Sequence, residues 1–425
     1  MESVVTKDQP VLFRQVRIID AVNQTDRVED VLLDVGNVVR VGVDAQSLSV
    51  DVEIIDRNNL ILGTGLVDLY STSGEPGFEQ RETLTSLAES ARRGGFTKVG
   101  ILPHTMPAMD DITALEFLHR QKDLPFMAWG AVTQGCEGKQ LTDLAEIAPA
   151  VVGFTDAKPI ENLSLVRRLM EYVKPLGKPL MLWACDRNLE SGGVMREGKW
   201  SLQYGLAGSP ACAEASTLSA LLELVRSTKT PTHFMRISTA RSVELIAQAK
   251  SDGLPVTASV TWLNLWLVDR DLSTYDPNLR LSPPLGFDSD RAALIAGIKS
   301  GTIDAIAVDH TPYTYEEKTV AFELSPPGAI GLEFILPILW QQLVVSGELT
   351  ALELWQALSL RPAQCLNLSL DLSNSGLSTL FDPTESWTVS KGSIASLSHN
   401  TSCLGKSIAG KVLQLNHLFD RTNFA

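Results

Sequence analysis

The sequence of 425 residues has few cysteines and lacks any long apolar run. Its five cysteines form no CxxC pair, which argues against a disulfide framework or a zinc knuckle and favours buried thiols. No apolar run approaches the roughly 18 residues that cross a bilayer. The N-terminus also lacks the basic start and the apolar stretch of a signal peptide. We therefore expect a cytoplasmic protein that does not enter membranes.

Positive charge is scarce as well, with 36 Lys and Arg residues against 50 Asp and Glu residues. The formal net charge of −14 argues against a general nucleic-acid binder, because contacts to phosphates need clustered Lys and Arg. Hydrophobic residues make up 44% of the chain and charged residues 20%, which is typical of a soluble globular protein with a sizeable core.

Short apolar runs dominate the middle of the chain and alternate with helix-like stretches. Such runs are typical of parallel strands that are buried on both faces of a sheet. Eight of them precede residue 310, at residues 62–68, 97–102, 126–132, 150–154, 179–183, 233–237, 256–260 and 305–309. Eight strand–helix units are what a (β/α)8 TIM barrel requires, so we predict an α/β protein of that fold.

The two ends of the chain have a different character. Residues 11–55 contain short alternating strands separated by Asn, Asp and Gly, and the C-terminal stretch returns to strands after residue 377. Together these segments predict a small composite β-sandwich domain. The predicted boundaries are 1–58 for its N-terminal part, 59–365 for the barrel and 366–425 for its C-terminal part.

Several short motifs occur in order along the predicted barrel. They are V-D-L-Y-S-T-S-G-E-P-G at 67–77, G-G-F-T at 94–97, L-P-H-T-M-P at 102–107, G-A-V-T-Q-G at 130–135 and V-D-H-T-P at 308–312. Each resembles a motif of the dihydroorotases, a family of the amidohydrolase superfamily whose first strand reads V-D-x-H-x-H-x-R-E-P-G. The resemblance runs through nearly the whole chain.

The resemblance implies a metal site whose ligands have been replaced. In the family, four histidines bind the metal, and an arginine of the first motif grips the substrate carboxylate. At the histidine positions this chain has Tyr70, Thr72, Trp183 and Arg236, and at the arginine position it has Gly74. Two acids survive at family positions, Asp156 and Asp309.

These replacements change the chemistry that the site can support. Catalytic zinc typically takes three protein ligands and keeps one position open for a water molecule, whose pKa it lowers. Two carboxylates make a poor ligand set, and the permanent charge of Arg236 would repel a divalent cation. We therefore expect no metal cofactor and predict that Arg236 pairs with Asp309 or Asp156. If the chain is active, it needs zinc, and Asp309 would act as general base and acid.

The family's substrate-binding positions have changed as well. His104 stands at the asparagine of P-N-T-x-P, Tyr313 replaces the last histidine of D-H-A-P-H, and Gly328 falls where the family reads F-G. Asn278 is retained at its family position, although the D-P-N sequence that contains it also fits a simple turn.

Two functions are compatible with these replacements. The first is a non-catalytic dihydroorotase-like protein of pyrimidine biosynthesis that serves as a scaffold or regulatory partner of aspartate carbamoyltransferase, with which degenerate family members assemble. The second is an active dihydroorotase or related cyclic amidohydrolase with a rebuilt site that hydrolyses a ring amide. The histidines available for such a site, His104, His233 and His310, form no HxH or HxxxH pair. The loss of every metal-binding histidine of the family favours the first function. Homo-oligomerisation is compatible with both functions.

Overall fold

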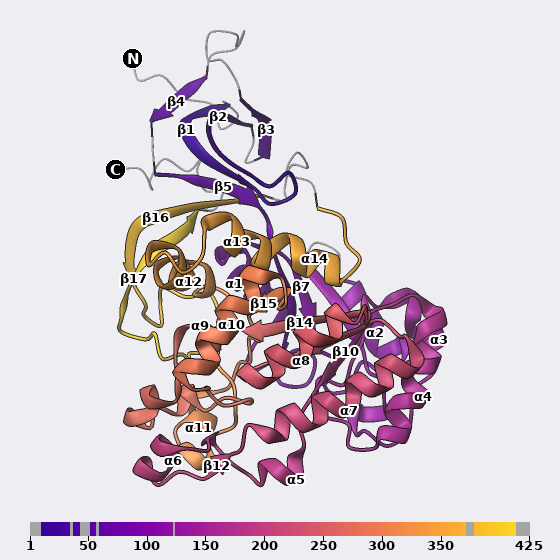
Figure 1. Cartoon of the computed structure of the whole chain (residues 1–425). Coiled ribbons are helices and arrows are strands. Elements are labelled where there is room, and N and C mark those ends of the chain that lie inside the picture. The colour runs from indigo at the N-terminus through magenta and orange to yellow at the C-terminus, as the bar shows by residue number, and fades with distance from the viewer. Residues whose placement is uncertain are drawn as a thin grey trace.

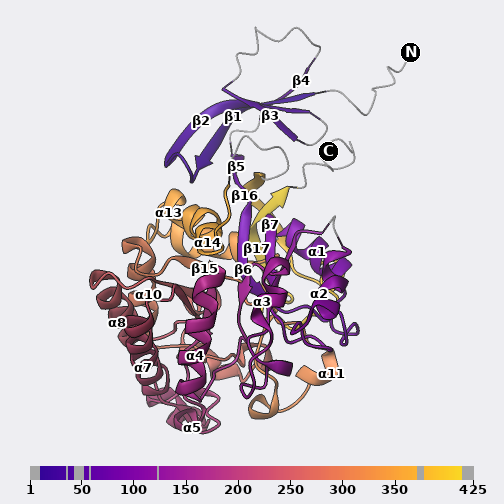
Figure 2. The same ribbon diagram turned by 90° about the vertical axis from the view of Figure 1, so that its right-hand side faces the viewer.

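The computed structural model describes residues 10–34, 37–42, 52–56, 59–121, 124–370 and 378–413. A barrel of parallel strands forms the larger body, and a smaller sheet lies beyond the end at which these strands begin (Figures 1 and 2). Segments from both ends of the chain meet in the smaller sheet, as predicted. Residues 1–9 and 414–425, which the sequence assigns to the small domain, lie outside the described residues.

The eight predicted runs form the barrel. Its strands are β6 (Leu66–Ser71), β7 (Phe96–Ile101), β8 (Phe126–Gly130), β9 (Gly153–Phe154), β10 (Leu180–Trp183), β13 (Thr232–Met235), β14 (Val256–Thr261) and β15 (Ala305–Ala307). They form one sheet in the order β15-β14-β13-β10-β9-β8-β7-β6. The first predicted run, 62–68, is divided at Gly65, and only its second half enters the barrel.

The barrel closes between β6 and β15 through contacts around the strand ends. Thr72 N donates to His310 O over 2.8 Å, just beyond both strands. Within the seam, the fully buried carboxylate of Asp68 accepts from Val308 N over 2.8 Å. A buried backbone N–H needs a partner because water cannot reach it, so the Asp68 side chain completes the closure where backbone pairing does not.

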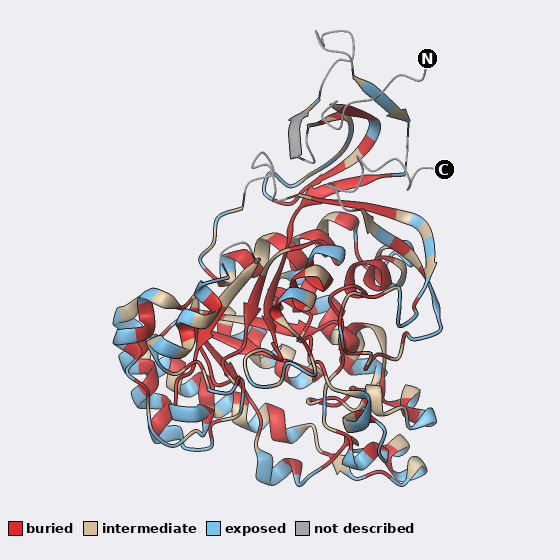
Figure 3. Cartoon of the chain, turned by 180° about the vertical axis from the view of Figure 1, so that it is seen from behind, coloured by how far each residue is buried: buried red, intermediate tan, exposed pale blue. Residues whose placement is uncertain are grey.

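Helices follow the strands and cover the outside of the barrel (Figure 1). They are α1 (Leu84–Arg93), α2 (Ile112–His119), α3 (Leu144–Ile147), α4 (Leu163–Val173), α7 (Cys212–Thr228), α8 (Ala240–Ser251) and α10 (Asp288–Ser300), with α12 (Ile335–Leu339), α13 (Ala351–Trp355) and α14 (Arg361–Cys365) after the last strand. Figure 3 shows buried strands and helices that expose their outer faces. Within the described residues, no helix is both long and apolar enough to cross a bilayer.

Helix α4 illustrates how the sequence builds this layer. The side chain of Asn162 accepts from Leu165 N and so caps the first turn. Leu165, Leu169 and Val173 are buried at a spacing of four residues, which places them along one face of the helix. This face packs into the barrel core, while the opposite face carries the charged side chains.

Insertions gather at the opposite end of the barrel from the small sheet (Figure 1). They contain α5 (Arg187–Glu190), β11 (Met195–Arg196), α6 (Lys199–Tyr204) and β12 (Gly208–Ser209) after β10, α9 (Leu263–Trp266) after β14, and α11 (Tyr315–Lys318) after β15. The carboxyl ends of the strands lie at this end, which is where barrels of this kind hold their functional residues.

The smaller sheet combines both ends of the chain. Its strands are β1 (Val11–Asp20), β2 (Thr25–Asp34), β3 (Asn37–Val41), β4 (Glu53–Asp56), β5 (Ile61–Thr64), β16 (Ser378–Thr388) and β17 (Ser407–Leu413). Their order is β17-β16-β5-β1-β2-β3, with β4 also on β1. β1 pairs with β4 before an irregularity between Phe13 and Val16 and with β5 after it. A strand that changes partners at a bulge makes a corner in a β-sandwich.

A tryptophan joins the small sheet to the barrel. Trp355 Nε1 donates to Thr64 O over 2.8 Å at the end of β5. The indole ring lies against Gly63 so closely that a Cβ there would be 2.3 Å from it. Ser359 Oγ donates to Gly65 O over 2.7 Å at the point where the chain enters β6. These contacts hold the connection between β5 and β6 against the helices that follow β15.

Closure through Asp68 predicts a pH-dependent stability. Burial raises the pKa of this carboxyl to about 7, whereas an unfolded Asp titrates near ~4. Between these values the folded chain binds a proton that the unfolded chain releases, so its stability falls as pH rises. We expect the free energy of unfolding to fall by up to about 1.4 kcal/mol per pH unit in that window through this group. Asp68→Asn should flatten the profile when urea unfolding is measured from pH 4 to 8.

The matched control is Glu171→Gln, an exposed carboxylate on α4. This variant should keep the wild-type dependence on pH. An Asp68→Asn profile as steep as the wild-type profile would contradict the assignment of the effect to the barrel seam.

Candidate functional site

A cavity of about 160 Å³ opens at the carboxyl ends of the barrel strands. Six of the nine predicted site positions line it: Thr72, His104, Trp183, Arg236, Asp309 and Gly328. The other three, Tyr70, Asp156 and Asn278, do not line this cavity. The barrel therefore brings most of the substituted positions together, from the ends of different strands.

An ion pair between Arg236 and Asp309 lies at the centre of the site. Arg236 Nη2 donates to Asp309 Oδ1 over 2.6 Å and Nε donates to Oδ2 over 2.8 Å, which makes the pair bidentate. The two side chains are only 10% and 14% exposed. The predicted partnership of Arg236 with Asp309 is confirmed. A guanidinium group thus neutralises the one acid that faces the cavity from β15.

The backbone at three strand ends adopts a left-handed conformation. The φ angles are 50° at Ala157, 59° at Arg236 and 53° at Asp309, after β9, β13 and β15. Non-glycine residues in this region cluster at functional sites, where the surrounding structure imposes them. Arg236 Nη1 also donates to Ala157 O over 3.3 Å, so the three residues form one contact group.

Tyr70 lies below the cavity floor and connects it to the barrel interior. Its hydroxyl accepts from Arg236 N over 3.2 Å and lies 3.2 Å from Ser259 Oγ. Ser259 in turn lies 2.8 Å from His233 Nε2, and His233 Nδ1 lies 2.8 Å from Thr257 Oγ1. Burial raises the pKa of Tyr70 and lowers that of His233 to about 3, so both are neutral. They form a column of uncharged hydrogen-bonding groups along the barrel axis.

Trp183 forms one wall of the cavity and supports two guanidinium groups. The centre of Arg236 lies 4.6 Å from the centroid of the indole ring, and that of Arg187 lies 4.7 Å from it. Cation–π contacts at this distance are attractive, particularly where water is excluded. Trp183 therefore forms part of the cavity wall and also positions positive charge.

His104 and Thr72 lie next to each other in the lining of the cavity. His104 Nε2 lies 3.5 Å from Thr72 Oγ1, and Nδ1 is buried with no hydrogen-bond partner among the described residues. Burial, together with repulsion from Arg236 and Lys158, lowers the pKa of His104 to about 3. The imidazole is neutral, with one ring nitrogen still available to a ligand.

Asp156 is held away from the cavity. One oxygen of its carboxylate accepts from Val132 N over 2.9 Å and from Thr133 N over 3.0 Å, and the other accepts from Thr133 Oγ1. Burial raises its pKa. The residue that faces the cavity after β9 is Ala157, one position further on. Asp156 therefore organises the loop after β8, and Asp309 is the only one of the two family acids at the cavity.

Asn278 and Gly328 are also separated. Gly328 lines the cavity with a φ of 137°, where a Cβ would lie 2.7 Å from the Thr311 side chain. Asn278 lines a separate surface groove of about 910 Å³. Its backbone N donates to Asp276 Oδ1 over 2.9 Å, which is the simple turn that the sequence also allowed. Tyr313 contributes to the lining of both the cavity and this groove.

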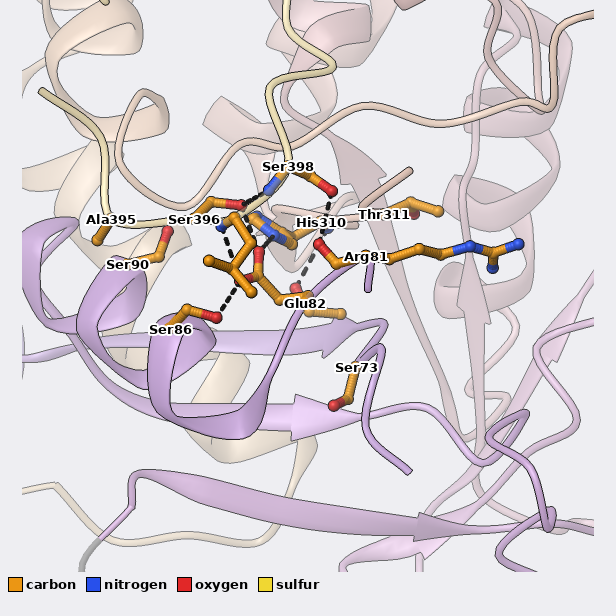
Figure 4. Close-up of polar contacts among 12 residues, drawn as sticks. Ser73, Arg81, Glu82, Ser86, Ser90, His310, Thr311, Ala395, Ser396 and Ser398 are labelled. Carbon is orange, nitrogen blue, oxygen red and sulfur yellow. Dashed lines mark hydrogen bonds and ion pairs between the residues drawn. The ribbon is translucent and has the colours of Figure 1, made fainter. Parts of the chain in front are cut away.

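His310 follows Asp309 directly but belongs to a buried cluster outside the cavity (Figure 4). Its Nδ1 accepts from Gly331 N over 3.2 Å, which leaves the ring proton on Nε2, 3.5 Å from Glu82 Oε2. Glu82 is fully buried and also accepts from Ser396 Oγ. The cluster ties the segment after β16 to the loop before α1. His104, His233 and His310 thus lie in three different environments and share no site.

These side chains do not fit a zinc centre. Among the described residues there is no group of three or more His, Cys, Asp or Glu side chains that could hold a metal ion. Tyr70 is engaged with the barrel column, and Arg236 brings a permanent positive charge that would repel a divalent cation. At Gly74 the backbone leaves no room for a side chain, since a Cβ there would lie 2.4 Å from Glu82 O.

Two cations at the cavity were not singled out from the sequence, Lys158 and Arg187. Lys158 follows β9 and Arg187 follows β10, each within a few residues of the end of its strand. This position after a strand was the signal in the sequence that could have marked them as cavity residues. Together with Arg236, three cationic side chains of the described residues therefore line the cavity.

The buried ion pair predicts a strong and asymmetric mutational effect. Asp309→Asn leaves the Arg236 charge without compensation, and we expect it to cost about 3 kcal/mol of stability in urea unfolding. Replacing both residues, in Arg236→Met with Asp309→Asn, should cost less than the sum of the single changes. The exposed pair of Arg167 and Glu171 is the control, where Glu171→Gln should cost no more than ~0.5 kcal/mol. Similar costs for Asp309→Asn and Glu171→Gln would contradict a stabilising central pair.

Comparison with known proteins identifies relatives of this chain. The family model described as "Dihydro-orotase-like" matches residues 59–242. A "Probable dihydroorotase-like protein" from Synechocystis sp. is 43% identical, over 94% of this chain and 98% of that protein. A dihydroorotase from Pelotomaculum thermopropionicum is 34% identical, over 94% of this chain and 95% of that protein.

Solved structures support the fold. The L-hydantoinase (dihydropyrimidinase) from Arthrobacter aurescens superposes with a TM-score of 0.80 at 20% identity, covering 95% of this chain and 94% of that chain. The dihydropyrimidinase from Brevibacillus agri gives a TM-score of 0.78 at 18% identity, covering 96% and 94%. Sequence identity at the level of the first two relatives, over nearly the full length, establishes that this chain belongs to the dihydroorotase family.

Proposed function

We propose that this chain is a non-catalytic member of its family, a cytoplasmic protein of pyrimidine biosynthesis that acts as a scaffold or regulatory partner of aspartate carbamoyltransferase. The observation that carries the proposal is the bidentate pair of Arg236 and Asp309. It occupies the centre of the site with a charge arrangement that is complete without a metal.

The proposal follows from what ring-amide hydrolysis requires. The reaction needs an activated water and a group that can take up and return a proton. Both oxygens of Asp309 already accept from Arg236, so the carboxylate could serve as base only by giving up those bonds. The neutral side chains of Tyr70 and Thr72 offer no basic group in place of a metal-bound hydroxide.

A retained barrel with a replaced site favours a structural or regulatory role. The barrel seam and the Trp355 connection are hydrogen-bonded, and Glu82 accepts from Ser396 in its buried cluster. A carbamoyltransferase partner is suggested by the family resemblance.

The decisive measurement is zinc content together with turnover. We expect less than stoichiometric zinc by elemental analysis of the purified chain, and no opening of the dihydroorotate ring with or without added zinc. Asp309→Asn serves as the matched control, because trace activity that persists in this variant comes from a contaminating enzyme. Stoichiometric zinc with turnover that Asp309→Asn abolishes would establish the alternative, an active cyclic amidohydrolase.

The partner is tested separately. We expect the chain to co-elute with the aspartate carbamoyltransferase of the same organism in size-exclusion chromatography and to change that enzyme's activity or its oligomeric state. Bovine serum albumin at the same concentration is the control for non-specific association. Independent elution over the micromolar range, with unchanged carbamoyltransferase activity, would remove this partner from the proposal.

A further inference from the structure

The column of polar side chains below the cavity floor comes from three barrel strands. Tyr70 lies on β6, His233 on β13, and Ser259 and Thr257 on β14. Consecutive polar atoms in this column are 3.2, 2.8 and 2.8 Å apart. The interior of a TIM barrel is ordinarily filled by branched apolar side chains, so hydroxyl and imidazole groups there must find their hydrogen-bond partners in one another.

The direction of these hydrogen bonds is fixed at the cavity end. The backbone N–H of Arg236 can only donate, and it donates to the Tyr70 hydroxyl over 3.2 Å. The single proton of that hydroxyl is therefore left for its other contact, Ser259 Oγ. If Ser259 donated to Tyr70 instead, the proton of this fully buried hydroxyl would have no acceptor among the described residues.

The same order continues from Ser259 to the imidazole of His233. Because Ser259 Oγ accepts from Tyr70, its own proton is donated to His233 Nε2. Burial lowers the pKa of His233 to about 3, so the ring is neutral and carries one proton. With Nε2 acting as an acceptor, that proton lies on Nδ1, which donates to Thr257 Oγ1 over 2.8 Å. The contacts are therefore all satisfied by one tautomer of His233.

The conformation of Arg236 depends on the cavity end of this series. Its backbone is left-handed, with a φ of 59°, and a non-glycine residue keeps such a conformation where the surrounding structure imposes it. The hydrogen bond from Arg236 N to Tyr70 is one of the contacts that impose it. Linked hydrogen bonds polarise one another, so a change at one member of the series is felt at the others.

We propose that His233 is a positioning residue for the cavity: as its Nδ1–H tautomer it holds Ser259 and Tyr70 in the one order that receives the backbone N–H of Arg236. His233 does not line the cavity and acts on it through these two hydroxyl groups. This role goes beyond the proposed scaffold function and is independent of it.

Nitrogen NMR of the full chain, made with isotopically labelled histidine, reads the tautomer directly. The His233 signals are those that disappear in His233→Gln. In the wild type we expect the protonated ring nitrogen of His233 to be Nδ1, with Nε2 unprotonated. A proton on Nε2 would overturn the proposal, and this measurement requires no variant other than the one used for assignment.

Thr257→Val tests the connection from the far end of the column. Valine has a similar shape but accepts no hydrogen bond from His233 Nδ1, so the proton should move to Nε2 and leave the Tyr70 proton unpaired. The backbone N–H of Arg236 should then exchange with water roughly fivefold faster, as expected when about one hydrogen bond is lost. NMR of the chain made with labelled arginine measures this exchange. Thr257→Ser keeps a hydroxyl and should restore both wild-type readouts.

Ser359→Ala is the matched control for Ser259→Ala. Both serines are fully buried, and Ser359 forms its hydrogen bonds at the junction with the small sheet, outside the column. Ser259→Ala should alter the His233 tautomer and accelerate exchange at Arg236. Ser359→Ala should lower the thermal unfolding midpoint and leave both readouts unchanged.

Two further results would contradict the proposed role of His233. One is a wild-type tautomer and wild-type exchange at Arg236 in both Thr257→Val and Ser259→Ala. The other is an equal effect of Ser259→Ala and Ser359→Ala on the two readouts, because the response would then reflect a general loss of stability.

Discussion

The bidentate contact between Arg236 and Asp309 is the interaction on which the rest of the site depends. Two charges that are nearly inaccessible to water can be kept there only if each is satisfied by the other and by further hydrogen bonds. Arg236 meets this condition through Asp309 and Ala157 O, and its backbone N–H donates to Tyr70. This pair lies in a cavity that is also lined by a neutral imidazole, that of His104, and by the indole of Trp183.

Tyr70 and Trp183 each have interaction partners of their own. Tyr70 extends into a column of neutral hydrogen-bonding groups inside the barrel, and Trp183 stacks with two guanidinium groups. The loop at Gly74 has closed against the backbone of Glu82. These contacts depend on one another, because packed interiors leave little room for independent changes. Returning one histidine to the site would therefore create a mismatch before it created a ligand.

The sequence predicted the barrel well because its signal is simple. Parallel strands buried on both faces must be short and apolar, and all eight barrel strands stood out for that reason. Pairing of Arg236 with Asp309 could also be predicted, since the carboxyl ends of the strands converge. The division of the first apolar run at Gly65 could not be predicted, because both halves of the run are equally apolar. Only the pairing of β5 with β1 and β16 assigns the first half to the small sheet.

The direction of side chains beyond the strand ends was harder to predict. After the two-residue strand β9, Asp156 turns toward the loop after β8 and the left-handed Ala157 faces the cavity, so a shift of one position reverses their roles. Asn278 lies in a loop whose path depends on tertiary contacts that no local pattern records. Lys158 and Arg187 lie outside the family motifs, so no motif marks them as cavity residues.

The arrangement of the small sheet also constrains how the chain is made. β5 lies between β1, from the first twenty residues, and β16, which begins at Ser378. During synthesis some three hundred residues must therefore be made after β5 before its second neighbour, β16, leaves the ribosome. The intervening barrel can already form in that time. The small sheet is then completed last, and until that moment one edge of β5 is an unpaired template for strands of other chains.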